Sequence, residues 1–205
     1  GNRSSCAVLT TYVHDGERPT PPSAYPEPFT PTSPSSDEPN PIFRGCADAD
    51  AIVDIYSQPG CLGPLEATLQ AEVEDATCPT GHAFFGLVAA TPNATTTFFG
   101  QRRSANGRIS ACVPLGTYLH DGIAPSAPTL VAVNPSSPSD NANPAIIGRA
   151  EPGVALSLHL DGSCAVQIGQ GFTDANGDFI VFANVNTNEL TPIHARATDT
   201  AGNTS

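Results

Sequence analysis

The chain has 205 residues, enough for one large domain or two of about 100 residues. Its 20 acidic against 8 basic residues give a formal net charge of −12, which makes nucleic acid and anionic membrane surfaces poor partners. No run of 18 apolar residues occurs, so no membrane insertion is predicted. Six cysteines without a C-x-x-C pair indicate disulfides in an oxidising compartment, and therefore a secreted, cell-surface or extracellular protein.

The opening phrase of the chain occurs twice. "CAVLTTYVHDG" at 6–16 matches "CVPLGTYLHDG" at 112–122, an offset of 106 residues. Further matches follow at an offset of 103 and then of 95, so the first copy carries eight extra residues between Cys61 and Phe84. The matched pairs include Cys6 and Cys112, Tyr12 and Tyr118, Cys61 and Cys164, Phe84 and Phe179, and Asn93 and Asn188.

These offsets predict two modules. We expect 1–18 to be the last strand and linker of a preceding or neighbouring module, 19–122 to be module 1, and 123–205 to be module 2. The extra residues of module 1 lie in an insertion at about 62–80. Ser205 corresponds to Ser110 and to Ser4, so the pattern is that of a longer array or of units that join end to end.

Short strands are predicted wherever apolar residues alternate with period two. The segments with this pattern are 51–56, 97–103, 154–160, 177–185 and 192–198. The one helix candidate is "PLEATLQAEVED" at 64–75, where Leu65, Leu69 and Val73 are four residues apart. The sequence therefore predicts an all-β protein of two tandem β-sandwich modules, with a short helix in the insertion of the first.

Three phrases resemble bacterial Ig-like domains. They are "NPAIIGRAEPGVALSLHLDGSC", "TDANGDFIVFANV" and "HARATDTAGNTS". The resemblance covers 123–205 well and 20–112 more loosely, since module 1 has "DAD" at 48–50 in place of Glu151, Pro152 and Gly153. It implies Ig-like modules in a tandem array of a secreted or surface protein: a spacer, stalk, fibre or adhesin segment without a catalytic site.

The cysteines suggest specific pairs. The simplest bridge within module 1 joins Cys61 to Cys112, and Cys46 and Cys78, which only module 1 possesses, are expected to pair in its insertion. Cys164 and Cys6 then remain, and we expect that Cys164 of one unit bonds Cys6 of the next. The alternative is that both are idle thiols.

Other candidate sites are weaker. "DANGD" at 174–178 offers the oxygens of Asp174, Asn176 and Asp178 to calcium, but an Asn-Gly hairpin turn is favoured, because module 1 has no carboxylate in the equivalent stretch. "HDG" at 14–16 and 120–122 is expected to brace the joint between modules. No Gly-x-Ser-x-Gly, phosphate-loop or H-E-x-x-H motif occurs, so we expect neither enzyme activity nor a cofactor.

Three functions follow as hypotheses. The first is an extracellular structural protein whose repeats form a fibre, stalk or filament, with copies of itself or adjacent repeats as head-to-tail partners. The second is an adhesin array that binds a carbohydrate or a protein. The third is a non-catalytic appendage of a secreted enzyme.

Overall fold

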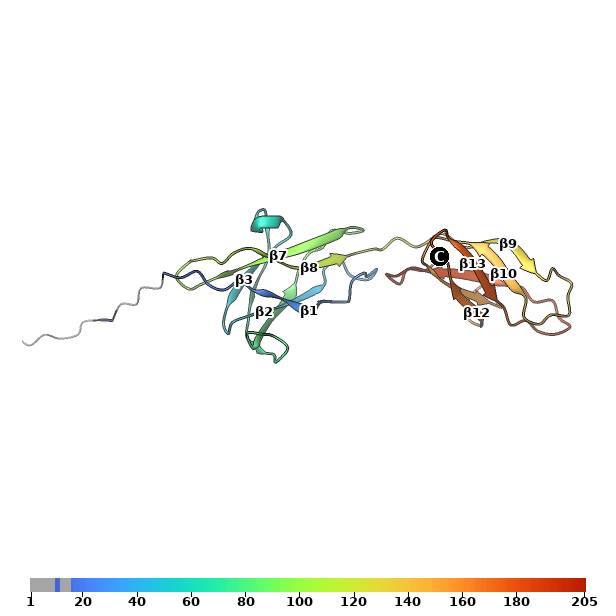
Figure 1. Cartoon of the computed structure of the whole chain (residues 1–205), viewed down its shortest axis with the longest axis horizontal. Coiled ribbons are helices and arrows are strands. Elements are labelled where there is room, and N and C mark those ends of the chain that lie inside the picture. Colours follow the sequence, from blue (N-terminus) through green and yellow to red (C-terminus); the bar gives the residue numbers. More distant parts are fainter. Residues whose placement is uncertain (1–9, 12–15) are drawn as a thin grey trace, which may run out of the picture.

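The computed structural model describes residues 10–11 and 16–205, so most of the predicted leading strand at 1–18 lies outside the described residues. The described chain is all-β and forms two groups of strands that lie end to end (Figure 1). Each group consists of two antiparallel sheets around its own buried cluster of apolar side chains. The all-β fold of two tandem β-sandwich modules is thus confirmed.

Module 1 contains the first eight strands. One sheet has the order β1-β2-β6-β5 and the other the order β4-β3-β7-β8. A single 3-10 turn, η1 (Pro59–Cys61), follows β3. The strands are β1 (Ser23–Thr30), β2 (Ile42–Ala47), β3 (Ile52–Tyr56), β4 (Leu65–Gln70), β5 (Val73–Glu74), β6 (His82–Leu87), β7 (Thr95–Arg103) and β8 (Val113–Leu119).

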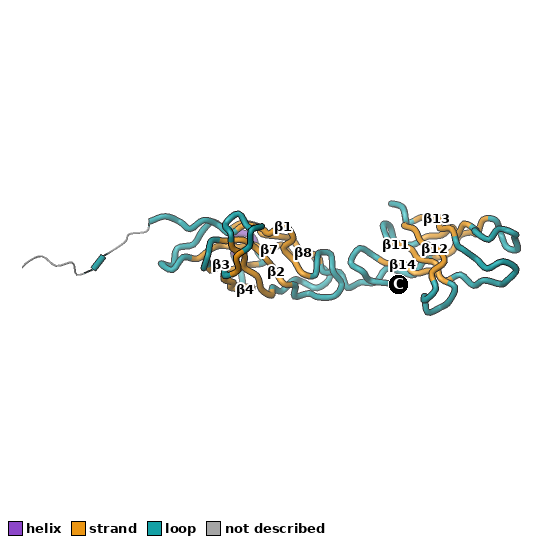
Figure 2. The backbone as a smooth tube through the Cα atoms, turned by 90° about the horizontal axis from the view of Figure 1, so that it is seen from below, coloured by secondary structure: helices purple, strands orange, loops and turns teal. Residues whose placement is uncertain are grey.

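Module 2 contains six strands in the described chain. One sheet has the order β13-β10-β9 and the other β12-β11-β14. The tube view in Figure 2 shows how short these strands are relative to the loops between them. The strands are β9 (Thr129–Asn134), β10 (Ala145–Arg149), β11 (Ala155–His159), β12 (Gln167–Phe172), β13 (Asp178–Phe182) and β14 (His194–Thr198).

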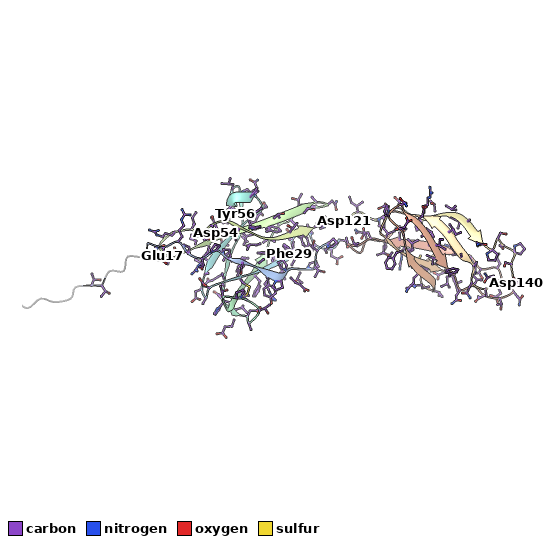
Figure 3. The ribbon with its side chains drawn as sticks, in the orientation of Figure 1. Glu17, Phe29, Asp54, Tyr56, Asp121 and Asp140 are labelled. Atoms are coloured by element: carbon purple, nitrogen blue, oxygen red, sulfur yellow. A yellow bond between two sulfur atoms is a disulfide. The ribbon has the colours of Figure 1, made fainter. Side chains whose placement is uncertain are left out.

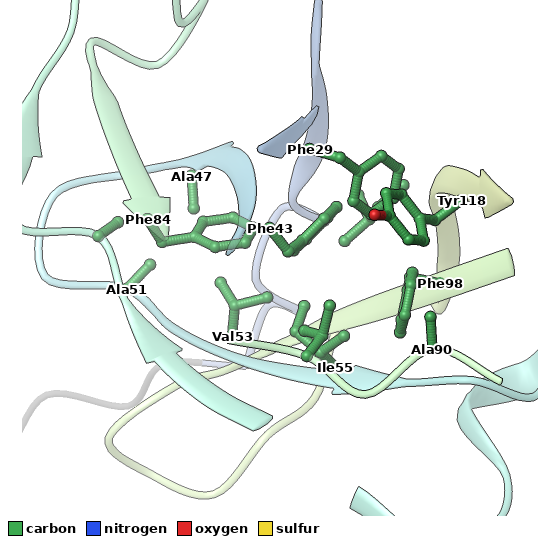
Figure 4. Close-up of a cluster of buried hydrophobic side chains, with 13 residues drawn as sticks. Phe29, Phe43, Ala47, Ala51, Val53, Ile55, Phe84, Ala90, Phe98 and Tyr118 are labelled. Carbon is green, nitrogen blue, oxygen red and sulfur yellow. The ribbon is translucent and has the colours of Figure 1, made fainter. Parts of the chain in front are cut away.

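The core of module 1 is built largely from aromatic rings (Figure 4). Phe43, Phe84 and Phe98 are fully buried, and the ring centroids of Phe43 and Phe98 are 6.0 Å apart. Gly45 makes room for the ring of Phe84, because a Cβ at this position would overlap that ring. Gly148 has the same relation to Phe179 in module 2, so the two cores share one plan.

The helix expected at 64–75 is wrong, because this segment forms strands β4 and β5. β4 pairs with β3 along its length, with Leu69 opposite Val53. Ala67 and Leu69 of β4 and Ala71, the residue after it, follow period two and pack on the core, while Leu65 is half exposed. Pairing with a central strand therefore outweighs the four-residue spacing of the leucines.

Tyr118 ties β8 to the loop that precedes β2. Its ring is fully buried against Phe29, and its hydroxyl donates a 2.9 Å hydrogen bond to the backbone carbonyl of Glu38. Replacing Tyr118 with phenylalanine keeps the ring and leaves this carbonyl without its partner. We expect the free energy of unfolding of module 1 to fall by about 1 kcal/mol, measured by guanidinium denaturation. An unchanged midpoint would show that the hydrogen bond contributes nothing.

Candidate inter-unit joint

The chain leaves module 1 through a bonded linker. The amide of Ser35 donates to the carbonyl of Leu119 at 3.1 Å, and the amide of Asp121 donates to the carbonyl of Ser35 at 2.9 Å. Asn93 holds the following residues: its amide donates to Nδ1 of the buried His120 at 2.9 Å, and its Oδ1 accepts from the amide of Gly122 at 2.7 Å. "HDG" at 120–122 therefore lies in the joint and is fixed to module 1.

Module 2 holds the same linker from the other side. Nδ2 of Asn203 donates to the carbonyl of Asp121 at 2.7 Å, and the amide of Ser126 donates to the carboxylate of Glu151 at 2.8 Å. Figure 3 places Asp121 in the segment between the two modules. Because Asn93 and Asn203 come from different modules, the linker is clamped from both ends.

Module 1 holds the chain that enters it in a matching way. Nη1 of Arg108 donates to the carbonyl of Gly16 at 2.7 Å, and the hydroxyl of Thr20 donates to the carboxylate of Asp48 at 3.0 Å. By the repeat offsets, Arg108 is the equivalent of Asn203, and Thr20 and Asp48 are the equivalents of Ser126 and Glu151. Equivalent positions of the two modules thus contact the entering chain, with different donor atoms and with acceptor carbonyls one position apart in the repeat.

The disulfides staple module 1. Cys46 is bonded to Cys78 and Cys61 to Cys112, with Cα–Cα distances of 5.4 and 5.7 Å, and both pairs are those expected from the sequence. Cys164 is a half-buried free thiol. Its backbone has the left-handed φ of 55°, as the bonded Cys61 has 54°. Cys6 lies outside the described residues.

The loop that carries Cys164 is organised by Asp161. Oδ1 of Asp161 accepts hydrogen bonds from the amides of Ser163 and Ala165, and Oδ2 accepts one from the amide of Val166. The hydroxyl of Ser163 and the amides of Val166 and Ala165 favour the ionised carboxylate and lower the pKa of Asp161 to about 2. Cys164 is therefore presented on an ordered turn.

An apolar groove of about 190 Å³ opens between the two sheets of module 2. Its walls include core positions as well as half-exposed ones, and it runs beside β14, which is an edge strand in the described part of the chain. The lining residues that matter below are Pro128, Val133, Ile146, Leu158, Phe179 and Ile193. Sequence reasoning did not find this groove, because no local pattern shows that a core is left open.

The suggested calcium residues form a hairpin turn. Oδ1 of Asp174 accepts from the amides of Asn176 and Asp178 at 2.8 and 2.9 Å, and Gly177 has a φ of +82°. The hydrogen bond from the Asp178 amide, followed by that from Asn176, lowers the pKa of Asp174. The carboxylate of Asp178 pairs with Arg149 at 2.7 Å. The carboxylate of Asp174 thus accepts hydrogen bonds within the turn, and that of Asp178 forms an ion pair.

Within residues 10–11 and 16–205, no cluster of three or more His, Cys, Asp or Glu side chains has the arrangement of a metal site. No helix in the described part of the chain has the length and hydropathy needed to span a membrane. Comparison with protein-family models and with curated proteins yields no match.

Proposed function

We propose that this protein is an extracellular structural protein whose Ig-like repeats join head to tail into a fibre, stalk or filament. The observation that carries the proposal is the recurrence of the joint. Arg108 and Asn203, which are equivalent positions, each donate to a backbone carbonyl of the entering chain, and the equivalent carboxylates Asp48 and Glu151 each accept from it. A contact that recurs once per module can extend along an array without limit, because it is heterologous and does not close.

Charge and disulfides support the same function. The net charge of −12 without any lysine gives the units mutual repulsion, which favours separate fibres over side-to-side clumping. The two disulfides of module 1 suit an oxidising extracellular environment. Pro125 and Pro128 in the linker between β8 and β9 favour extended geometry and stiffen the joint.

An adhesin array is the second candidate, favoured by an apolar pair exposed on each module. Phe85 and Leu87 lie on β6, and their equivalents Ile180 and Phe182 lie on β13, all with at least 50% of their surface exposed. Exposed apolar side chains that recur at equivalent places indicate a contact surface. This surface would add binding to a structural array.

Electron microscopy of the purified full chain tests the structural function. We expect linear particles the width of one sandwich, whose length grows with protein concentration under non-reducing conditions. Single two-module particles at every concentration would contradict the proposal.

A further inference from the structure

We propose that residues 6–13 of a second copy of this chain complete module 2 as an added strand along β14. Leu9 and Tyr12 of that copy fill the groove, and its Cys6 forms a disulfide with Cys164. This inference rests on the proposed head-to-tail function and names the contact that produces it. Module 1 serves as the template, because it contains its own last strand, the two core side chains of that strand and the disulfide.

First, in the described chain, one edge of strand β14 is not paired with any named strand. In module 1, β7 pairs with β3 on one side and β8 on the other. The equivalent strand in module 2, β14, pairs with β11 on one side. On its other side, the described chain has no named strand. β14 also begins only at His194, although the residues equivalent to the start of β7 are 190–193. The edge available for pairing is therefore that which β8 covers in module 1.

The second step is that the groove is the place of two missing core side chains. In module 1, Leu115 and Tyr118 of β8 are buried in the core. The groove residue Val133 lies opposite Ile146, just as Phe29 lies opposite Phe43. The remaining walls are likewise equivalents of module 1 core residues, namely Leu158 of Ile55, Phe179 of Phe84, and Ile193 of Phe98. The groove is thus the core of module 2 seen without its last strand.

The third step identifies the occupant. Residues 6–13 are the equivalents of 112–119, and they place Leu9 and Tyr12 where Leu115 and Tyr118 stand in β8. The two described residues of this segment, Thr10 and Thr11, are exposed and belong to no strand. The segment therefore carries both side chains that the groove lacks, at the correct spacing.

The fit extends to the one position where β8 has a glycine. A Cβ on Gly116 would lie 3.0 Å from the ring of Phe29 and 3.1 Å from Pro28. The entering segment has Thr10 there, and module 2 has Val133 and Ala132 in place of Phe29 and Pro28. Because Val133 and Ala132 are smaller than Phe29 and Pro28, they leave room for Thr10 where module 1 has a glycine. At Gly100, whose equivalent is Ala195, an added Cβ would meet the mobile end of Leu115, so Leu9 adapts by a change of rotamer.

The fourth step concerns the two ends of the added strand. The hydroxyl of Ser110 accepts a hydrogen bond from the amide of Arg102, and the amide of Ser110 donates to the carbonyl of Arg102. Ser205 makes the same two hydrogen bonds with Ala197. Module 2 therefore keeps the register of module 1 up to Ser205, shortly before the position where β8 would start. At the other end, Asn188 has a φ of 59°, matching the 53° of Asn93 that holds His120 and Gly122. Asn188 is thus shaped to hold His14 and Gly16 of the second copy.

The disulfide follows from the same equivalence. Cys164 has the backbone conformation of Cys61, whose partner Cys112 is the equivalent of Cys6. Formation joins the sulfur atoms of Cys6 and Cys164 by thiol–disulfide exchange with a dithiol-type or glutathione-type disulfide as the oxidant. That oxidant takes the two electrons and two protons and leaves as two thiols.

The arrangement adds units along one line. Carrying over the β7–β8 register places Ala7 opposite Ala195 and Thr10 opposite Ile193. An added strand in this direction leaves module 2 at the end remote from module 1, where Figure 3 places Asp140. There it leads into module 1 of the second copy, and each further chain repeats the step.

The test uses two full-length variants that are each blocked on one side. Leu9→Arg removes the donor side chain, and Ile193→Arg places a charge in the acceptor groove. Alone, each is expected to show at least a tenfold loss of oligomers relative to the unmodified chain by non-reducing size-exclusion chromatography with light scattering. Mixed, they are expected to form a dimer and nothing larger, with Cys164 of the Leu9→Arg chain bonded to Cys6 of the Ile193→Arg chain.

Matched controls keep the result interpretable. Thr11→Arg changes a neighbouring residue whose equivalent, Thr117, is exposed, so oligomers are expected to persist. Should Ile193→Arg fail to fold, Cys164→Ser replaces it as the acceptor-side variant and should abolish only the covalent link. Undiminished fibres with Leu9→Arg would overturn the strand proposal and leave the structural function standing. A monomeric unmodified chain at all concentrations would contradict the structural function itself, and a Cys6–Cys164 bond within one monomer would overturn the second-copy partner.

Discussion

Replacing Cys61 and Cys112 with serine is expected to lower the free energy of unfolding of module 1 by about 4 kcal/mol. The bond joins the turn after β3 to the start of β8 and closes a loop with a sequence separation of 51 residues. Without it, the unfolded chain regains the entropy of that loop, and the strand that covers the core is no longer anchored at its beginning. Guanidinium denaturation under non-reducing conditions measures the loss.

Tyrosine fluorescence makes this measurement specific to one module. Module 1 contains Tyr25, Tyr56 and Tyr118, whereas 123–205 contains no tyrosine and the whole chain has no tryptophan; the fourth tyrosine, Tyr12, is replaced by phenylalanine in every chain compared. The matched control is Cys164→Ser, which removes a thiol at the equivalent position where the single chain has no bond. Followed by far-UV circular dichroism, which reports on both modules, it should change stability by no more than about 0.5 kcal/mol. A double variant as stable as the unmodified chain would contradict the role assigned to the bond.

Truncating Phe98 to alanine is expected to destabilise module 1 by about 3–5 kcal/mol. The ring is fully buried, its centroid is 5.8 Å from that of Phe29, and the strand that carries it is covered on its outer side by β8. The truncation leaves a cavity that the surrounding rings cannot fill. The shift in the tyrosine-detected denaturation midpoint measures the effect.

Ile193→Ala is the matched control in module 2, because Ile193 is the equivalent of Phe98 but lines the open groove. In the single chain it should cost about 1 kcal/mol, since a side chain that is only partly buried loses less on truncation. Far-UV circular dichroism follows both modules. Equal losses at the two positions would show that the core of module 2 is as closed as that of module 1, and would contradict the missing strand.

Much of the fold could be predicted from local patterns and from the repeat. Alternation at 51–56 and 154–160 places Val53, Ile55, Leu156 and Leu158 in the cores, as the structure shows. Comparison of the two copies predicts the cysteine pairs of module 1: Cys61 and Cys112 recur as Cys164 and Cys6, and Cys46 and Cys78, which module 2 lacks, are left to pair with one another. Such inferences need no knowledge of the three-dimensional fold.

The insertion and the groove could not be predicted in this way. The leucine spacing in 64–75 fits a helix and a strand equally well. The segment becomes a strand because it pairs with β3, and this pairing partner cannot be seen in the sequence of 64–75 itself. The groove exists because Val133 of β9, Ile146 of β10 and Ile193, which directly precedes β14, come together. The repeat already predicts that 1–18 is the last strand of another module, but only the folded backbone shows that the uncovered edge of module 2 forms a groove.

The central claim is that copies of this unit join head to tail, and a disulfide map of the native protein tests it most directly. Intact mass under non-reducing conditions should give multiples of the mass of a single chain that collapse to that one mass on reduction. The peptide map of the same material should contain Cys6 bonded to Cys164 of another chain. A single mass under both conditions, with Cys6 and Cys164 both present as free thiols, would contradict the account.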